Sequence, residues 1–284
     1  MKRLLCTVVM AGVCAGMAAP ARAQSRPLVT EDPETVPAGY ILLEAGVDFL
    51  NGASYPATGL TGNLTKIGTF GLSFGVSSIV ELQVDGGLIN RLAITSIDPT
   101  APLHFRYTGG PDDTSSFEDL SIGAKVRFVS ETESRPAIAL RFVTRLPLVG
   151  TDTGLGTGTT DFNVGVAVAK TVRSTRVATN LGLGIMGDPV HGDLQNYLVT
   201  YGLSFARAIR TGAEFVAEFN GRVDLGSDVP PVGTDTRSHV RVGGRFTHGP
   251  VRIDAGLLLG ITDRDPNWGV TFGATWVFKA FTVK

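Results

Sequence analysis

The feature that most constrains the fold is an alternation of apolar residues with polar or small ones, which recurs along almost the whole chain. In Phe70–Val76, large apolar side chains occupy every second position and Gly or Ser stands between them. Leu120–Phe128 repeats the scheme, with Lys125 and Arg127 on the polar face. Successive side chains of a strand point to opposite faces, so each segment has one apolar and one polar face. A period of two predicts β-strands rather than helices.

Twelve segments carry this pattern. Each is about 10–14 residues long, which suits a tilted strand that crosses a bilayer and exceeds the ~5–6 residues typical of soluble sheets. The expected strands cover residues 40–50, 63–76, 79–92, 117–129, 137–147, 159–170, 177–186, 196–207, 212–224, 237–247, 251–261 and 267–279.

Connections between these segments alternate between short and long. Those after the even-numbered strands are short, and most of those after the odd-numbered strands are longer and rich in Gly, Pro, Asp and Thr. Tight periplasmic turns and longer outer loops are typical of an outer-membrane barrel. The expected short turns are 77–78, 130–136, 171–176, 208–211 and 248–250, and the expected long loops include 51–62, 93–116, 148–158 and 225–236.

The positions of aromatic residues agree with this arrangement. If the apolar face meets lipid, aromatic side chains should gather near both membrane interfaces. Parity places one group on the lipid-facing side at the outer ends of the strands and a second group at the periplasmic ends. The outer group is Phe49, Phe162, Tyr197 and Trp268, and the periplasmic group is Phe128, Phe205, Phe246 and Phe278.

We therefore expect an all-β fold: a closed, antiparallel, up-and-down transmembrane β-barrel of about 12 strands, with short periplasmic turns and longer outer loops. Closure is required because unpaired backbone groups cost several kcal/mol each in hydrocarbon. The alternative is a soluble two-sheet sandwich, whose strands would be shorter and whose polar face would meet water.

The amino-terminal residues predict secretion. Lys2 and Arg3 precede an uncharged, mostly apolar stretch, and Ala21-Arg22-Ala23 provides the small residues of a cleavage site before Gln24. We expect residues 1–23 to be a signal peptide, residues 24–39 an irregular segment and residues 40–284 the barrel. The expected location is the cell outer membrane of a Gram-negative bacterium. A lipoprotein is disfavoured because Cys14 follows Val13 rather than a small residue.

The segment 24–39 contains three prolines, three acidic residues and no alternation, which predicts irregular structure at the periplasmic end. The sequence leaves open whether it folds into the lumen as a plug. In that arrangement it would contact basic residues such as Arg127 and Arg252.

Composition excludes several classes of function. Both cysteines, Cys6 and Cys14, lie in the expected signal peptide, so the mature chain would have no disulfide and no thiolate site. The net charge is −1, which gives no attraction to nucleic acid. We expect no cofactor and no metal. Outer-membrane lipid, a small-molecule solute and the barrel-assembly machinery are the expected partners.

Several motifs resemble those of a known family. The run Arg26-Pro27-Leu28-Val29-Thr30-Glu31-Asp32-Pro33-Glu34-Thr35-Val36-Pro37-Ala38-Gly39 leads into the first strand, and Phe117-Glu118-Asp119-Leu120 opens the fourth. Leu146-Pro147 is followed by Gly154-Leu155-Gly156-Thr157-Gly158-Thr159-Thr160-Asp161-Phe162. Together they resemble the outer-membrane barrels named for the meta-pathway of phenol degradation.

That resemblance covers nearly the whole mature chain and implies an outer-membrane channel or transporter, for aromatic or other hydrophobic compounds among other solutes. It does not imply an activity on phenol. One departure is the end of the chain, because such barrels commonly finish on an aromatic residue and here Lys279 to Lys284 follow Phe278.

Motifs that would indicate catalysis have simpler interpretations. Gly154 to Gly158 resembles a phosphate-binding loop, but a strand follows it instead of the helix that such a loop needs. None of the four histidines occupies a lipid-facing strand position, where a barrel phospholipase would need one. Asp188, His191 and Asp193 could ligate a cation, although solvated loop residues are the simpler interpretation. We therefore expect no catalytic residue.

Charged residues gather on the polar face. They could form a self-paired network that fills a narrow lumen, or they could line a passage with an electrostatic constriction. The two interpretations are compatible. The lumen-lining candidates are Glu44, Asp48, Glu81, Asp85, Lys125, Arg127, Arg141, Arg145, Glu214, Glu218, Arg222, His239, Arg241, Arg245, Arg252 and Asp254, with Asp119 and Asp161 on the same face.

One strand pair allows a prediction of register. In an antiparallel pair the numbers of facing residues have a constant sum. One register places Glu214 opposite Arg245 and Glu218 opposite Arg241, and it also sets Asn220 against His239. We expect this register and a mainly structural role for these charges.

Three functions remain from the sequence. The first is a channel or transporter for small solutes, hydrophobic or aromatic ones included. The second is a closed barrel whose outer loops bind a partner. The third, which has the least support, is a lipid-modifying enzyme. The sequence does not indicate the oligomeric state.

Overall fold

The computed structural model describes residues 26–226 and 230–283, and the expected signal peptide lies outside this range. Within the described residues, thirteen strands form one sheet, and two short 3-10 helices lie in its loops. The strands are β1 (Tyr40–Tyr55), β2 (Leu60–Gly75), β3 (Val80–Ile97), β4 (Asp113–Ser116), β5 (Leu120–Val129), β6 (Ala137–Leu146), β7 (Asp161–Val172), β8 (Thr175–Gly187), β9 (Gln195–Arg210), β10 (Ala213–Asp224), β11 (Arg237–His248), β12 (Val251–Gly260) and β13 (Trp268–Lys279), and the helices are η1 (His104–Arg106) and η2 (Thr151–Thr153).

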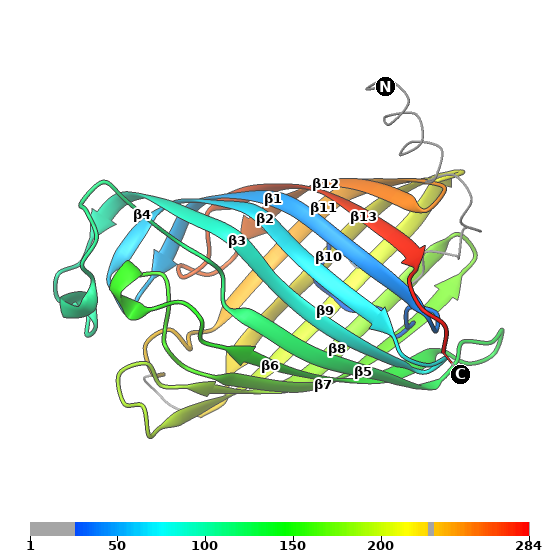
Figure 1. Cartoon of the computed structure of the whole chain (residues 1–284), viewed down its shortest axis with the longest axis horizontal. Helices are drawn as coiled ribbons and strands as arrows, with labels where there is room; N and C mark the ends of the chain where they lie inside the picture. The colour runs from blue at the N-terminus through cyan, green and yellow to red at the C-terminus, as the bar shows by residue number, and fades with distance from the viewer. Residues whose placement is uncertain (1–25, 227–229, 284) are drawn as a thin grey trace, which may run out of the picture.

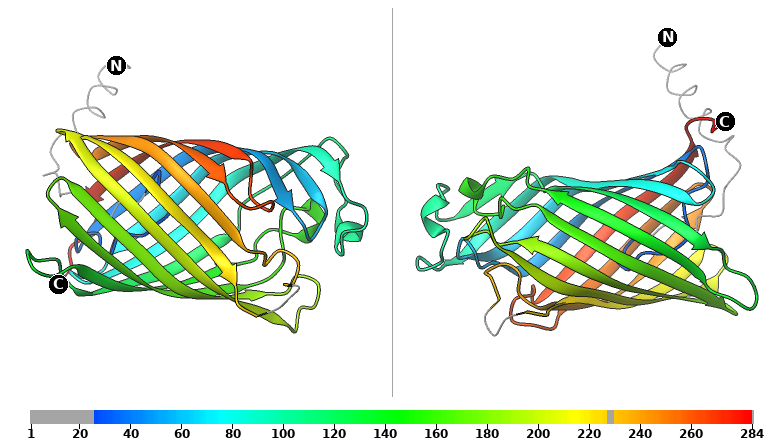
Figure 2. Two further views of the ribbon diagram at one scale, coloured as in Figure 1. Left: turned by 180° about the vertical axis from the view of Figure 1, so that it is seen from behind. Right: turned by 90° about the horizontal axis from the view of Figure 1, so that it is seen from below.

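The sheet closes on itself as a barrel (Figures 1 and 2). Each long strand pairs antiparallel with its neighbours, and β1 pairs with β13 over Tyr40–Asn51. Closure leaves no long strand with an open edge, so the backbone polar groups are paired within the wall. The predicted up-and-down barrel is confirmed, with twelve long strands and the short β4 in addition.

The barrel has two different ends. One end, here called the loop end, carries η1, β4 and η2, and the opposite turn end carries the short connections (Figure 1). The turn end also holds the start of β1 and the end of β13. There the backbone N–H groups of Ala280 and Phe281 donate to the carbonyl of Gly39.

The loop end departs from the sequence prediction. The expected loop 51–62 is a turn of residues 56–59, because β1 and β2 continue past a bulge at Gly52, which has φ +71°. The expected loop 93–116 contains the end of β3 and all of β4. The strand β4 pairs with Asn90–Ala93, on the edge of β3 that β5 occupies closer to the turn end.

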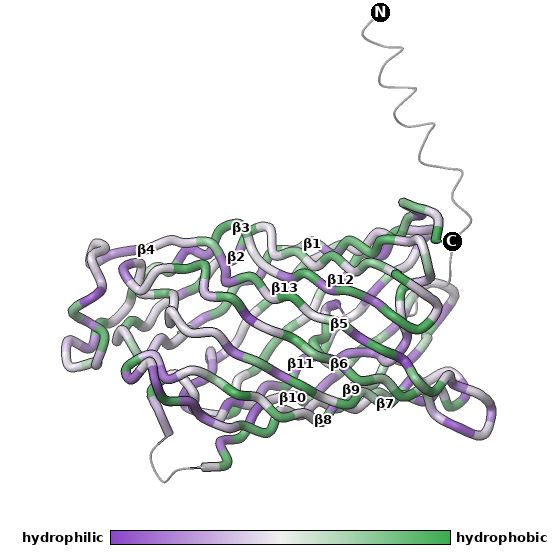
Figure 3. The backbone as a smooth tube through the Cα atoms, turned by 60° about the horizontal axis from the view of Figure 1, so that its bottom comes forward, coloured by the Kyte–Doolittle hydropathy of each residue, from purple (hydrophilic) through white to green (hydrophobic). Residues whose placement is uncertain are grey.

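The outer surface of the barrel is apolar. Ile122 and Leu203 are 46% and 39% exposed on the outward face, and hydrophobic and hydrophilic residues alternate along the strands (Figure 3). Exposed aromatic residues lie near both ends, with Phe162, Tyr197 and Trp268 at the loop end and Phe128, Phe205 and Phe246 at the turn end. A band of this kind is suited to hydrocarbon, so the barrel spans a membrane. Among the described residues no helix is both long enough and apolar enough to cross one.

Buried apolar residues lie inside the barrel as well. At the loop end, Ala53, Leu60, Leu64 and Leu92 form a cluster against which Leu50, Tyr55 and Leu155 pack. Nearer the turn end, Leu28 packs with wall residues Ala206 and Val216, and Val36 packs with Leu42 and Val277. The lumen is therefore partly filled from both ends.

Candidate functional site: the lumen

Residues 26–38, here called the inner segment, lie in the lumen between its middle and the turn end. The prolines at positions 27, 33 and 37 have no N–H to donate to a strand ladder, and the segment has no strand of its own. Its side chains and backbone contact strands around nearly the whole circumference of the barrel.

Wall side chains satisfy the backbone amides of this irregular segment. Glu218 accepts hydrogen bonds from the N–H groups of Val29 and Thr30, at 3.0 and 2.8 Å. Glu81 accepts one from Val36 at 2.7 Å, and Asn180 accepts one from Glu31 at 2.7 Å. A buried amide without a partner would cost free energy, so these acceptors hold the segment in one conformation.

The acidic side chains of the inner segment meet basic side chains of the wall. Glu31 lies 3.2 Å from Lys125 Nζ and 3.3 Å from Arg141 Nε. Asp32 forms two hydrogen bonds with Arg176, and Glu34 pairs with Arg127. At the start of the segment the charge is reversed, because Arg26 lies 3.8 Å from Asp48 and 3.7 Å from Asp254. Charges of the wall and the segment are thus complementary along its length.

Glycines in the wall give the backbone of the segment room to approach. A Cβ placed on Gly75 would lie 2.1 Å from the carbonyl oxygen of Pro37, and one on Gly202 would lie 2.7 Å from Oγ1 of Thr30. A larger residue at Gly75 would displace the backbone of the segment, whereas one at Gly202 would require the Thr30 side chain to change. The glycines of β2 and β9 therefore allow the inner segment to lie close to the wall.

The structure places the predicted lumen residues in three groups. The group around the inner segment holds Glu44, Asp48, Glu81, Asp85, Lys125, Arg127, Arg141, Glu218, Arg241 and Asp254. The group near the turn end is Glu214, Arg245 and Arg252, with Arg245 Nε 2.9 Å and Arg252 Nη2 3.8 Å from Glu214. The group toward the loop end is Arg145, Arg222 and His239.

The predicted register of β10 and β11 is confirmed. Glu214 faces Arg245, Glu218 faces Arg241, and Asn220 faces His239. The side-chain nitrogen of Arg241 lies 2.7 Å from Glu218 and 3.1 Å from the amide oxygen of Asn220. Glu218 also accepts hydrogen bonds from the inner segment. The register alone could not predict this contact.

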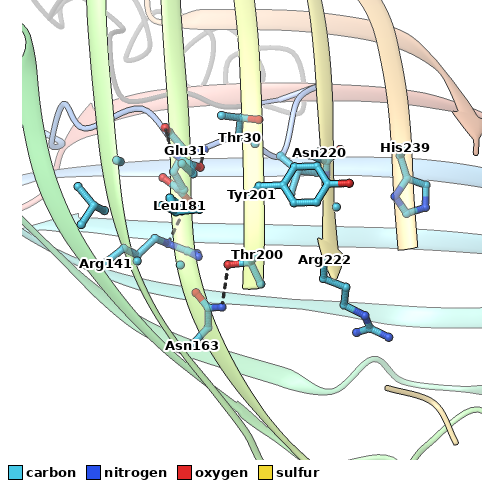
Figure 4. A pocket seen from close by; sticks show the side chains of 18 of the residues that line it. Thr30, Glu31, Arg141, Asn163, Leu181, Thr200, Tyr201, Asn220, Arg222 and His239 are labelled. Carbon is cyan, nitrogen blue, oxygen red and sulfur yellow. Dashed lines mark hydrogen bonds and ion pairs between the residues drawn. The ribbon is translucent and has the colours of Figure 1, made fainter. Parts of the chain in front are cut away.

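The loop-end half of the lumen contains three adjoining cavities, of about 360, 290 and 330 Å³. The first begins at Val29–Glu31, and Arg141, Asn163, Thr200 and Arg222 are among its lining residues (Figure 4). The second reaches the loop-end cluster, and Arg222 belongs to the lining of all three. Cavities therefore lie between the outer loops and the inner segment.

Sequence reasoning missed several residues of this region. Arg237, Asn163 and Asn180 all line the first cavity. Arg237 has the same parity as His239 and Arg241, so the alternation also predicts that its side chain faces the lumen. Arg176, which pairs with Asp32 and with Glu131, could have been found in the same way on β8.

His239 is held by an outer loop. Its Nε2 lies 3.0 Å from Asp265, in the loop between β12 and β13. Burial alone would raise the pKa of Asp265, but hydrogen bonds from the backbone N–H groups of Ser238 and Thr262 hold it below its usual value. Asp265 thus acts as an ionised anchor for the loop end of β11.

The remaining motifs form no reactive centre among the described residues. His191 Nδ1 lies 3.1 Å from Asp188, and no group of three residues there has the arrangement of a metal site. The glycine-rich stretch 154–158 packs over the loop end, where Thr58 donates a 2.7 Å hydrogen bond to the carbonyl of Gly154. The short helix η2 precedes this stretch and no helix follows it, so it lacks a phosphate-binding geometry.

No protein-family model matches this chain, and no curated protein matches its sequence. Its structure is similar to that of an outer membrane channel from Pseudomonas putida F1, with a TM-score of 0.62 and 14% identity, over 87% of this chain and 98% of that one. The fold is that of an outer-membrane β-barrel. Weaker similarities are to the NanC porin (TM-score 0.49, 7% identity, 85% and 100% covered) and to the CymD monoaromatic hydrocarbon channel (TM-score 0.45, 9% identity, 86% and 89% covered).

Proposed function

We propose that this protein is an outer-membrane channel that admits small solutes into its lumen from the loop end. The observation that carries the proposal is the row of three adjoining cavities between the outer loops and the inner segment. The apolar outer surface and the similarity to the channel of Pseudomonas putida F1 support an outer-membrane location. We also propose that the signal peptide is cleaved before Gln24 and that the loop end faces the exterior.

The inner segment is the proposed barrier of this channel. It occupies the half of the lumen nearest the turn end, where Lys125, Arg127 and Arg176 hold its acidic side chains. Passage through the barrel then requires this segment to move. If the segment never moves, the protein is a closed barrel. Its function would then be the binding of a partner by the outer loops.

Membership of the phenol meta-pathway barrel family also belongs to the proposal. The motifs in Arg26–Gly39 and Gly154–Phe162 support it: the first forms the inner segment and the second packs over the cavities. We propose passage or binding, without catalysis, because the described residues that line the cavities show neither a nucleophile paired with a base nor a group of metal ligands.

Planar-bilayer recordings of the purified mature protein test this proposal against a variant that lacks residues 26–36. We expect small, intermittent currents from the native protein and a several-fold higher conductance from the variant. A heat-dependent gel shift serves as the control that both barrels are folded.

Two outcomes would contradict parts of the proposal. If neither folded protein conducts, the barrel is closed and the channel is ruled out. If both conduct equally, the channel stands and the barrier role of the inner segment does not.

A further inference from the structure

Two arginines face each other directly in the lumen near the loop end. Arg222 of β10 and Arg237 of β11 are register partners, and both line the first and second cavities. Like charges placed directly across a strand pair destabilise it, so such a pair needs compensation. The next inward pair on these strands is Asn220 with His239, and the charged pairs beyond it have opposite signs, because Glu218 faces Arg241 and Glu214 faces Arg245.

Neither arginine has a carboxylate at ion-pair distance within the described chain. Arg222 donates to the backbone carbonyls of Asp235 and Gly233, at 3.0 and 2.9 Å. Arg237 donates from Nη2 to the carbonyl of Ser54 at 3.3 Å, and its buried Nε has no hydrogen-bond partner there. Neutral carbonyls fix the direction of the side chains but do not neutralise them, and Asp161 and Asp235 act on Arg222 only from beyond ion-pair distance.

The acidic residues of this region are engaged elsewhere. Asp161 pairs with Arg145 at the third cavity, and Asp235 lies 3.7 Å from Arg264 in the outer loops. Lys66, which also lines the second cavity, lies 2.5 Å from Glu118. The second cavity is lined by Lys66, Arg145, Arg222 and Arg237, and no acidic side chain is among its described lining residues.

Part of the lining of this cavity is apolar. Leu50, Ala53, Leu64 and Leu155 line it, and all four belong to the loop-end cluster or pack against it. The cavity volume of about 290 Å³ is close to the lower limit of ~300–1,000 Å³ for small-molecule sites. Apolar side chains and a pair of guanidinium groups in the lining of one cavity suit a compact solute with an apolar body and one anionic group.

From this geometry we propose that the second cavity is a binding site for small organic monoanions, with a carboxylate on an aromatic or short aliphatic body. Arg237 and Arg222 hold the carboxylate, for which the guanidinium fork is well matched. The surface of Leu50, Leu64 and Leu155 contacts the body. This inference rests on the proposed function, since it names the solute class for the same lumen, although binding can be measured without passage.

Isothermal titration calorimetry on the detergent-solubilised mature protein tests the site. The probe is benzoate, and its neutral counterpart is benzamide. We expect benzoate to bind at least tenfold more tightly than benzamide, and its affinity to fall as ionic strength rises. Arg237→Gln and Arg222→Gln should each weaken benzoate binding at least tenfold and leave benzamide unchanged.

Arg91→Gln is the matched control. Arg91 lies on the outward face of β3 and is paired with Asp113, so its loss removes the same charge outside the lumen. Benzoate affinity should not change in this variant. In the absence of ligand, Arg237→Gln should unfold at the same temperature as the native barrel or a higher one, because it removes one of two opposed charges.

The inference is overturned if benzoate and benzamide bind equally, or if the two lumen variants bind benzoate as the native protein does. Liposome swelling with benzoate separates this result from failure of the proposed function. Passage of benzamide as fast as benzoate, with no binding preference, contradicts the anion site but leaves the channel standing. Specific binding without any swelling contradicts the channel and supports the site.

Discussion

Lys125 illustrates, at the scale of single residues, how charges are accommodated inside this barrel. Its side chain is fully buried, between Glu81 of the wall at 3.3 Å and Glu31 of the inner segment at 3.2 Å. A buried charge is tolerated only where partners replace the lost water. One partner comes from the sheet and the other from a segment that could leave, so the lysine keeps a counter-ion in either arrangement.

Parity predicted most of these residues but not their partners. The alternation placed Glu81, Lys125 and Glu218 on the inward face, and antiparallel geometry placed Glu218 opposite Arg241. The contact of Glu81 with the amide of Val36 spans 45 positions of the chain, and that of Glu218 with the amide of Val29 spans 189. No sequence pattern joins the partners. Such contacts depend on how the inner segment is seated, which periodicity does not describe.

Exchange of Glu218 and Arg241 is the first test at this scale. Either Glu218→Arg or Arg241→Glu alone leaves like charges facing each other in the lumen, and it should cost on the order of 3–5 kcal/mol of stability. The double exchange should recover much of that loss. Urea unfolding in detergent, followed by the gel shift, measures all three.

The exchange should not restore the position of the inner segment, because arginine at position 218 has no acceptor for the amides of Val29 and Thr30. Protease cleavage within residues 26–36 should therefore be faster in the double variant than in the native protein. If the double exchange recovers neither the stability nor the gel shift, the pairing role of Glu218 and Arg241 is contradicted.

Element boundaries show where sequence patterns stop being informative. The turn-end connections are close to prediction, since each is a short break between two clear alternations. At the loop end the alternation continues outside the membrane, so β1 and β2 extend to a four-residue turn and the expected loop 51–62 is not formed. The four residues of β4 are too few to show a period, and pairing with β3 alone makes them a strand.

The two faces of β9 allow a direct test of the membrane assignment. Leu203 lies on the outward face near the middle of the strand, and Thr200 lines the first and third cavities. Leu203→Arg should cost ~2–4 kcal/mol, the penalty of a charge near the bilayer midplane. Thr200→Asn on the same strand should cost little, because the lumen offers polar partners such as Asn163. Refolding into phosphatidylcholine vesicles measures both, and equal costs would contradict the face assignment.

For the whole molecule, the central relation is that between the barrel and its own amino-terminal segment. Three prolines and three acidic residues predicted an irregular segment, and they left its position open. Its position follows from complementarity over long distances, since acidic residues at 31, 32 and 34 meet basic residues of β5, β6 and β8. The sheet topology brings those basic residues together, and no local pattern in the segment encodes this.

A reversible cross-link tests whether that segment moves when solutes pass. A Cβ placed on Gly202 would lie 3.4 Å from the Cβ of Thr30, close to the 3.5–4.5 Å separation that a disulfide needs. The Thr30→Cys, Gly202→Cys variant of the mature chain would hold the only two cysteines, because Cys6 and Cys14 lie in the expected signal peptide. Oxidised, it should keep its gel shift and lose most of its swelling activity, and reduction should restore that activity. The Thr30→Cys single variant, treated in the same way, controls for the oxidant. Equal activity of the oxidised and reduced forms would show that solutes pass a stationary segment, because the cross-link leaves the twelve-stranded wall intact and fixes only the segment.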